Sequence, residues 1–448
     1  MANEKKLRLP NGPSKKLLGL VNLVNIRKST TNFLEKNLKK YGTVFTFEIG
    51  KNRIMYIQEP EMIKELLVNY NNVCIKGRVL EAAKDILGEG LLTNNNPQEH
   101  LRQRRLLQPA FHQKKITMYS QIMIDYAYNF IENWTDNKEV TINEEMMELT
   151  LKIVCRTLFD TDMNYDLSKI EAALNVFLER ALDVNNPLAA LTKKLPTRRN
   201  LKFLEAKKFL DETISQMIKE REGKAEERLD LLSTMISARD EGHKMNSIQI
   251  RDETMTLFLA GHETTANAIS WTLYLLGLNP DKEEKVFEEI KNNIGNNKIT
   301  PEDVNKLPYL RKVLTESMRI YPPAWIIARR PLVDINLKDY DIPAKTICLM
   351  SQFLMHRDSR YYEKPEDFIP ERWTEDFKNS IPKFAYFPFG GGARVCIGEQ
   401  FAWTEGVLIL AVILQKWKLN LIPNQNIELN HLITLRPKNG IKIKMNLR

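Results

Sequence analysis

The most informative stretch of the chain is Phe389-Gly390-Gly391-Gly392-Ala393-Arg394-Val395-Cys396-Ile397-Gly398, in which three glycines precede an arginine and a cysteine. Glycines permit a tight turn that brings backbone N–H groups close to the sulfur. These groups, with the N-terminus of a helix expected after Cys396, stabilise a thiolate. A thiolate ligates heme iron and favours O–O cleavage. The alternative is a glycine-rich loop with an incidentally buried cysteine, and these ten residues alone do not decide between the two.

The composition of the chain limits the classes of protein to which it can belong. The 448 residues carry 66 basic and 57 acidic side chains, a net charge of +9, which attracts acidic partners. No basic and aromatic module stands out, so we expect no nucleic-acid binding. Cys74, Cys155 and Cys348 lie far from Cys396 and from one another, without zinc-site or disulfide spacing, so we expect them in the core. Cytoplasmic localisation is therefore expected.

The chain shows no repeat, low-complexity tract or linker that would separate two domains. No apolar run approaches the ~18 residues that a membrane-spanning helix needs. The short apolar segment Leu17–Ile26 is not followed by a small-residue cleavage site. We therefore expect one soluble domain over residues 1–448, monomeric and without a fused reductase, in which residues 1–30 form a lead-in.

Hydrophobic periodicity predicts a mainly α protein with a minor β portion. The longest predicted helix runs from Asn246, with Gln249 as its capping-box partner, to Gly277. It is apolar on nearly all faces, as expected for a helix through the centre of a large domain. Strand patterns occur at 44–50 and 54–57, within 331–349, and at 432–435 and 441–445 on either side of an Asn-Gly turn signal.

Residues 389–398 fill every fixed position of Phe-x-x-Gly-x-Arg-x-Cys-x-Gly, and so resemble the heme-binding signature of the cytochrome P-450 superfamily. The resemblance implies the single-domain P-450 fold with its long central helix over heme b. It implies that Cys396 is the iron ligand, that Arg394 pairs with a heme propionate, that Phe389 packs beside the thiolate and that Gly398 belongs to the cysteine loop. The implied activity is that of a heme-thiolate monooxygenase.

The middle of the long helix, Ala260-Gly261-His262-Glu263-Thr264-Thr265, resembles the oxygen-activating segment of that family. Gly261 lets the backbone distort and leaves room for dioxygen. Thr264 and Glu263 supply an alcohol and an acid that relay protons into an apolar pocket. The alternative is a purely structural role, in which the threonine is bonded back to its own helix and the glutamate has structural contacts.

Other residues match family positions around the heme. Glu316 and Arg319 lie three apart on one helix face and resemble the family pair that joins Arg372 in a buried network. His100, Arg104 and Arg329 resemble the residues that hold the propionates, although many relatives have Trp where this chain has His100. His262 lies at the variable position of the oxygen-activating motif, and His356 is expected to be structural. Surface positions are expected for the remaining three: His112, His243 and His431.

By resemblance, residues 79–92, 257–261, 324–328 and 432–434 line an apolar pocket for a lipophilic substrate, fatty-acid-like or terpenoid-like. Dioxygen is the co-substrate, and a ferredoxin or flavodoxin with its reductase supplies the electrons. A peroxide-driven peroxygenase or isomerase and a non-catalytic heme-binding accessory protein are the alternatives.

Two clusters of basic residues suggest either weak peripheral membrane contact or solvated faces. One cluster precedes the short apolar segment Leu17–Ile26, and by resemblance the other lies in the loop and helix that cover the substrate entrance. They are Lys5, Lys6, Arg8, Lys15 and Lys16, and, around Pro196, Lys193, Lys194, Arg198, Arg199, Lys202, Lys207 and Lys208.

Overall fold

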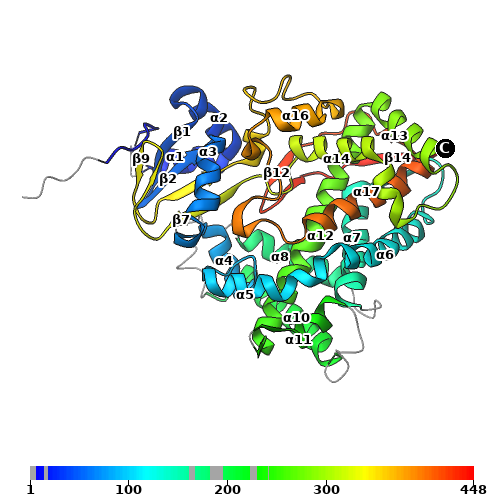
Figure 1. The fold of residues 1–448 in the computed structure, drawn as a ribbon, viewed down its shortest axis with the longest axis horizontal. Coiled ribbons are helices and arrows are strands. Elements are labelled where there is room, and N and C mark those ends of the chain that lie inside the picture. The colour runs from blue at the N-terminus through cyan, green and yellow to red at the C-terminus, as the bar shows by residue number, and fades with distance from the viewer. Residues whose placement is uncertain (1–6, 15–18, 161–166, 182–194, 222–229, 241) are drawn as a thin grey trace, which may run out of the picture.

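The computed structural model describes residues 7–14, 19–160, 167–181, 195–221, 230–240 and 242–448. It confirms a mainly helical chain with a smaller β portion (Figure 1). Strands β1, β2, β7 and β9 lie with α1 and α2 at one end of the molecule, whereas β14 lies at the other end. The α-helices are α1 (Leu20–Lys28), α2 (Thr30–Tyr41), α3 (Pro60–Lys64), α4 (Arg78–Leu87), α5 (Pro97–Leu107), α6 (Gln113–Ile131), α7 (Ile142–Phe159), α8 (Leu167–Ala181), α10 (Arg198–Lys219), α11 (Leu231–Ser237), α12 (Ser247–Leu278), α13 (Pro280–Asn293), α14 (Pro308–Ile320), α15 (Gln352–Met355), α16 (Glu375–Ser380) and α17 (Glu399–Lys416).

The strands form one larger sheet and several small ones. They are β1 (Val44–Ile49), β2 (Asn52–Ile57), β3 (Cys74–Lys76), β4 (Lys138–Thr141), β5 (Arg239–Asp240), β6 (His243–Lys244), β7 (Ile327–Pro331), β8 (Ile335–Leu337), β9 (Tyr340–Ile342), β10 (Ile347–Met350), β11 (Trp417–Leu421), β12 (Leu429–His431), β13 (Leu435–Pro437) and β14 (Lys442–Leu447). The larger sheet has the order β1-β2-β10-β7-β3, and only the β2–β10 pair within it is parallel.

The long central helix is confirmed as α12, which has 32 residues. The Asn246 side chain accepts a hydrogen bond from the Gln249 amide, and the Gln249 side chain accepts one from the Asn246 amide, so the predicted capping box is formed. The helix ends before Pro280 and packs against α7, α14 and α17. Because neighbours cover it on nearly all sides, its apolar residues form the centre of the core (Figure 1).

The predicted hairpin of 44–50 and 54–57 is present as β1 and β2. The strand predicted at 432–435 was misplaced, because residues 432–434 are not in a strand. β13 starts at Leu435 and pairs with β12, whereas β14 pairs with β11 and with the distant β4. Gly440 does adopt a positive φ of 74°, so the Asn-Gly turn signal was real but joins strands of two different sheets.

The buried network around Glu316 is confirmed. Its carboxylate accepts hydrogen bonds from Nε and Nη2 of Arg319, both at 2.9 Å, and from Nε of Arg372 at 3.0 Å. Trp373 and the amide of Ile369 also donate to it. Because Glu316 and Arg319 are completely buried, this set of donors offsets the desolvation of both charges. The network fixes the chain that leads into residues 389–398.

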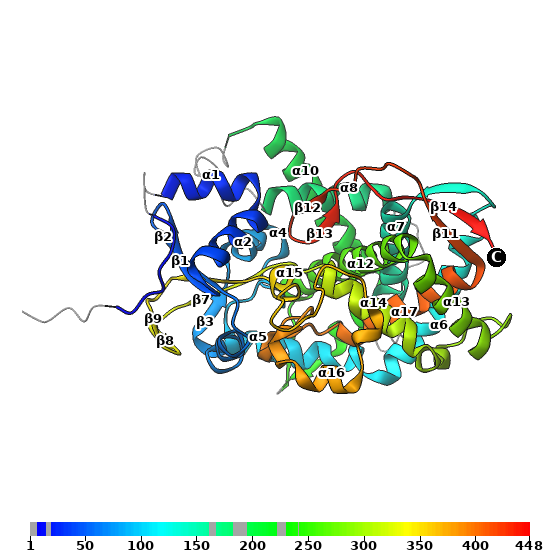
Figure 2. The same ribbon diagram turned by 90° about the horizontal axis from the view of Figure 1, so that it is seen from above.

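Among the described residues, no helix combines the length and the hydropathy that a membrane crossing would need. Figure 2 shows α12 running through the molecule, with α17 on one side of it and α8 and α10 on the other.

Candidate functional site

A large apolar cavity lies between α12 and the loop that precedes α17. Its volume is about 1450 Å³. All four predicted pocket segments contribute to its wall, through Leu92, Leu257, Ala324 and Ile433 among others. Its wall also reaches α1, α2 and the β1–β2 hairpin, which the sequence did not predict; these residues include Leu20, Leu23, Ile26, Phe47 and Ile54.

Cys396 lines this cavity, and unlike Cys74, Cys155 and Cys348 its side chain is exposed. The glycine loop is closed by a hydrogen bond from the Cys396 amide to the Phe389 carbonyl at 3.0 Å, and α17 begins three residues after Cys396. The pKa of the Cys396 thiol is raised, by enclosure away from water and by the charge of Glu399, and a hydrogen bond from the Gly398 backbone with the charges of Arg104 and Lys76 offsets this only in part. The amide and the cations are the groups that would stabilise a thiolate here.

The loop is tightly packed, which explains two of its glycines. Gly392 has a φ of 69°, and a Cβ there would lie 2.0 Å from the Leu67 carbonyl oxygen. A Cβ on Gly391 would lie 2.4 Å from the Phe384 ring. Phe389 lines the cavity, and its ring lies 5.5 Å from that of Trp403.

A cluster of positive groups lies at the same end of the cavity. Arg329 and Arg394 are buried as predicted, and Lys76, which the sequence did not predict, is buried beside them and pairs in register with Arg329. Burial and mutual repulsion lower the pKa of Arg329 to about 10 and hold that of Lys76 well below its usual range. Within the described chain, neither Lys76, Arg329 nor Arg394 forms an ion pair with a carboxylate.

These residues fit a dianionic group such as the two propionates of heme. Nε and Nη2 of Arg394 are buried without a hydrogen-bond partner in the described chain, while Nη1 donates to the Asn94 carbonyl at 2.7 Å. Unpaired buried charges are costly, so the cluster requires an anion. Burial and then Arg394 lower the pKa of His100 to about 3, so His100 is neutral and offers a hydrogen bond rather than a charge. Arg104 donates to the Val395 carbonyl at 2.6 Å and braces the cysteine loop.

Across the cavity from the cysteine loop, α12 presents Gly261 and Thr264. The Thr264 hydroxyl is half-exposed to the cavity and donates to the Ala260 carbonyl at 2.8 Å. The helix remains continuous here, so the backbone distortion expected at Gly261 is not present in this structure. A Cβ on Gly261 would lie 3.0 Å from Cγ2 of Val154, so this glycine also allows the close packing of α7 on α12.

Glu263 is buried and points to the C-terminal strands. Its Oε1 accepts hydrogen bonds from the Thr434 hydroxyl and, at 2.6 Å, from Nε of Arg436. Arg436 also donates to the Asn175 side chain at 2.9 Å. Thr264 is thus bonded back to its own helix and Glu263 has structural contacts, which are the features that the alternative interpretation of the motif expected. The ion-pair partner Arg436 was not predicted from the sequence.

The other histidines are placed as follows. His356 is buried and its Nε2 accepts from the Phe387 amide at 3.0 Å, so it is structural as predicted. Nδ1 of the buried His262 lies 2.9 Å from the Phe258 carbonyl of its own helix. His112 is exposed, and the side chain of His243 lies outside the described residues. The surface position predicted for His431 was wrong: its ring packs edge-on against Trp325 and Phe353, and burial lowers its pKa to about 4.

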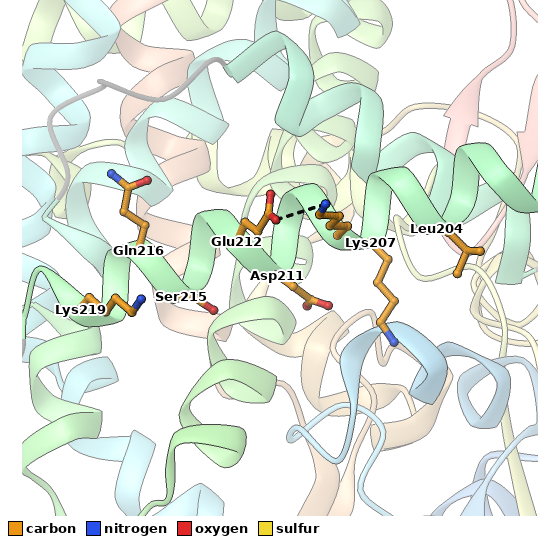
Figure 3. A pocket seen from close by; sticks show the side chains of 8 residues that line it. Leu204, Lys207, Asp211, Glu212, Ser215, Gln216 and Lys219 are labelled. Carbon is orange, nitrogen blue, oxygen red and sulfur yellow. Dashed lines mark ion pairs between the residues drawn. The ribbon is translucent and has the colours of Figure 1, made fainter.

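A second hollow, of about 760 Å³, lies on the outer face of α10. Figure 3 shows that its side chains come from this one helix, with an ion pair between Lys208 and Glu212 at 3.8 Å. Lys207 turns away and donates to the Asp85 carbonyl of α4. The hollow faces solvent and holds none of the predicted site residues.

Comparison with known proteins agrees with this geometry. A family model described as Cytochrome P450 matches residues 10–445. The chain is 34% identical to "Cyclooctatin synthase" of Streptomyces melanosporofaciens, over 87% of this chain and 86% of the relative. It is 32% identical to "Cyclooctat-9-en-7-ol 5-monooxygenase" of the same species, over 86% and 84% of the two chains. It is 31% identical to "Pentalenene oxygenase" of Streptomyces avermitilis, over 92% of each.

The predicted fold and the cavity that joins the Cys396 thiol to Thr264 agree with the match over nearly the whole sequence: the chain belongs to the cytochrome P450 family and is a heme-thiolate monooxygenase.

Proposed function

We propose that the enzyme hydroxylates a cyclic terpenoid, with dioxygen as co-substrate. The observation that carries this proposal is a single apolar cavity of about 1450 Å³ that the Cys396 thiol and the Thr264 hydroxyl both face. Aliphatic side chains dominate the wall and suit a hydrocarbon skeleton. Two relatives have names that refer to oxidation of pentalenene and of a cyclooctatenol.

Each site residue has a proposed part in this reaction. Cys396 would hold the heme iron, and Arg394, Arg329, Lys76 and His100 would hold the propionates. When bound, heme b supplies the activation of dioxygen. Gly261 and Thr264 line the cavity on the side of α12. The Thr264 hydroxyl, which donates to the Ala260 carbonyl, would turn from that carbonyl to donate its proton into the cavity. Glu263, an acceptor for Thr434 and Arg436, would take up a proton from solvent and pass it on through water to Thr264.

We propose that a ferredoxin or flavodoxin delivers the electrons in the reducing cytoplasm to a monomeric enzyme. Lys114 and Lys383 are exposed near the cysteine loop. Lys114 lies three residues after Phe111, whose ring would be 3.8 Å from a Cβ on Gly398, and Lys383 precedes Phe384, which packs on Gly391. Acidic carriers are steered to such a surface.

We also propose weak contact with anionic lipid surfaces through α1 and the start of α10, which lie toward the same face in Figure 2 but well apart along that face in Figure 1. Leu20 and Val24 are each 55% exposed, and Leu204 is 58% exposed. Arg198 and Lys202 are exposed beside them. The predicted Lys193, Lys194, Lys5, Lys6, Lys15 and Lys16 lie outside the described residues.

Liposome co-sedimentation tests this contact. We expect binding to anionic vesicles that decreases with salt and weakens in Val24→Glu. No binding at low salt would contradict the contact.

The test of the main proposal is turnover of cyclic sesquiterpenes and diterpene alcohols with a surrogate ferredoxin system under ¹⁸O₂. Candidates are chosen by the change in heme spin state on binding. We expect one ¹⁸O atom in the product. Product formed with peroxide alone, with no gain from electrons and dioxygen, would instead indicate a peroxygenase, and no product from any bound terpenoid would contradict the substrate class.

A further inference from the structure

The segment Gly88–Asn95, between α4 and α5, lies directly against α12. Two glycines allow this approach. A Cβ on Gly88 would lie 1.9 Å from Oδ2 of Asp252, and one on Gly90 would lie 2.2 Å from Oγ1 of Thr256. Gly88 also has a φ of 56°, which disfavours other residues. No larger side chain fits between the segment and the helix at these points.

Two adjacent carboxylates of α12 accept hydrogen bonds from the backbone of this segment. The Glu89 amide donates to Oδ2 of Asp252 at 2.8 Å, and the Leu91 amide donates to Oε2 of Glu253 at 3.0 Å. Glu253 is completely buried and forms no ion pair within the described chain. Asp252 also accepts from Nη1 of Arg251 at 2.9 Å. Both acids thus accept backbone amides of the loop, and Asp252 in addition pairs with Arg251.

The other end of the segment reaches the cation cluster. The Asn94 carbonyl accepts from Nη1 of Arg394 at 2.7 Å, and the Asn95 side chain accepts from the Lys76 amide at 3.0 Å. Between the two ends, Leu92 forms part of the cavity wall. Any shift of the segment away from α12 therefore moves the cavity wall and the backbone that orients Arg394.

We propose that Asp252 and Glu253 are positioning residues that set the shape of the substrate cavity by holding Gly88–Asn95 against α12. The inference rests on the cavity being the heme and substrate site. Burial raises the pKa of Glu253 to about 8, so it is protonated at neutral pH, and a neutral glutamine can replace it as acceptor. An aliphatic residue of similar size cannot, because it leaves the Leu91 amide buried without a partner.

The experiment compares Glu253→Leu with Glu253→Gln in the heme-loaded enzyme. The probes are imidazole, which needs little more than the heme, and 4-phenylimidazole, which extends into the cavity; both are read by absorption spectroscopy. For Glu253→Leu we expect about tenfold weaker binding of 4-phenylimidazole, the scale of one buried amide without its acceptor. Imidazole binding stays unchanged, and amide hydrogen exchange over residues 88–95 accelerates. Glu253→Gln matches the wild type.

Glu289→Leu is the matched control, because Glu289 also accepts backbone amides, those of Tyr309 and Leu310, without lining the cavity. Gly90→Ala tests the same contact from the loop side if Glu253→Leu does not fold, since its methyl group would collide with Thr256. It should reproduce the loss for 4-phenylimidazole. Unchanged exchange and probe binding in these variants, or an equal effect in Glu289→Leu, would overturn the inference. Failure of the wild type to bind either azole would instead contradict the heme site itself.

Discussion

The contact between Glu263 and Arg436 allows the catalytic and the structural contributions of Glu263 to be separated. Glu263→Gln and Arg436→Gln both remove the same ion pair, but only the first removes the acid. The two side chains are 2% and 18% exposed. Breaking a fully buried pair costs about 3–5 kcal/mol. Because Arg436 is partly exposed and retains Asn175 as acceptor, we expect about 2–3 kcal/mol of lost unfolding free energy in Glu263→Gln. Arg436→Gln leaves the buried Glu263 without its cation, so we expect about 3–5 kcal/mol there.

The catalytic readout is the share of consumed electrons that appears as peroxide rather than product, measured with a terpenoid that changes the heme spin state. If Glu263 supplies protons to Thr264, Glu263→Gln uncouples the reaction by about 10²-fold or less, whereas Arg436→Gln keeps most of the coupling. Urea denaturation of the same samples measures the loss of stability in each variant. Equal uncoupling in the two variants would refute the reasoning, because the effect would then belong to the ion pair.

Three further predictions follow from the site. Thr264→Ala should keep heme and substrate binding but release peroxide, and the rate of product formation per electron consumed should fall by about 10²-fold or less. An unchanged share of electrons in product would show that Thr264 takes no part in proton delivery. Burial raises the pKa of Glu405 to about 8, so its folded form stays protonated while its unfolded form ionises, and stability falls as pH rises from the unfolded value towards 8. Glu405→Gln should therefore gain stability relative to the wild type between pH 5 and 8 in urea denaturation, and a constant difference would contradict this. Lys114→Glu with Lys383→Glu should slow reduction by an acidic ferredoxin severalfold at low salt in stopped-flow absorption, and an unchanged rate would place the carrier elsewhere.

The features that the sequence predicted well depend on local signals. The capping box at Asn246, the stop at Pro280 and the apolar faces between them define α12 within one continuous segment. The cysteine loop is likewise a contiguous motif, and its glycines are explained by contacts at Gly391 and Gly392. Such elements can be read along the chain because their determinants are close in sequence.

The features that were missed depend on contacts between distant segments. Lys76 belongs to no motif and becomes part of the cation cluster only because β3 pairs with β7, which brings it beside Arg329. Arg436 meets Glu263 because β13 pairs with β12, not with the strand after the Asn-Gly turn. His431 is covered through the same pairing, by Trp325. A turn signal predicts where the chain bends but not which strand it joins.

The central claim, that the Cys396 sulfur is the iron ligand facing the cavity, is tested most directly by the absorption spectrum of the reduced, carbon monoxide-bound protein. The wild type and the matched control Cys348→Ser, in which a buried cysteine of β10 is changed, should both show the strongly red-shifted band of thiolate ligation. Cys396→Ser should lose this band. Its survival in Cys396→Ser would contradict the account.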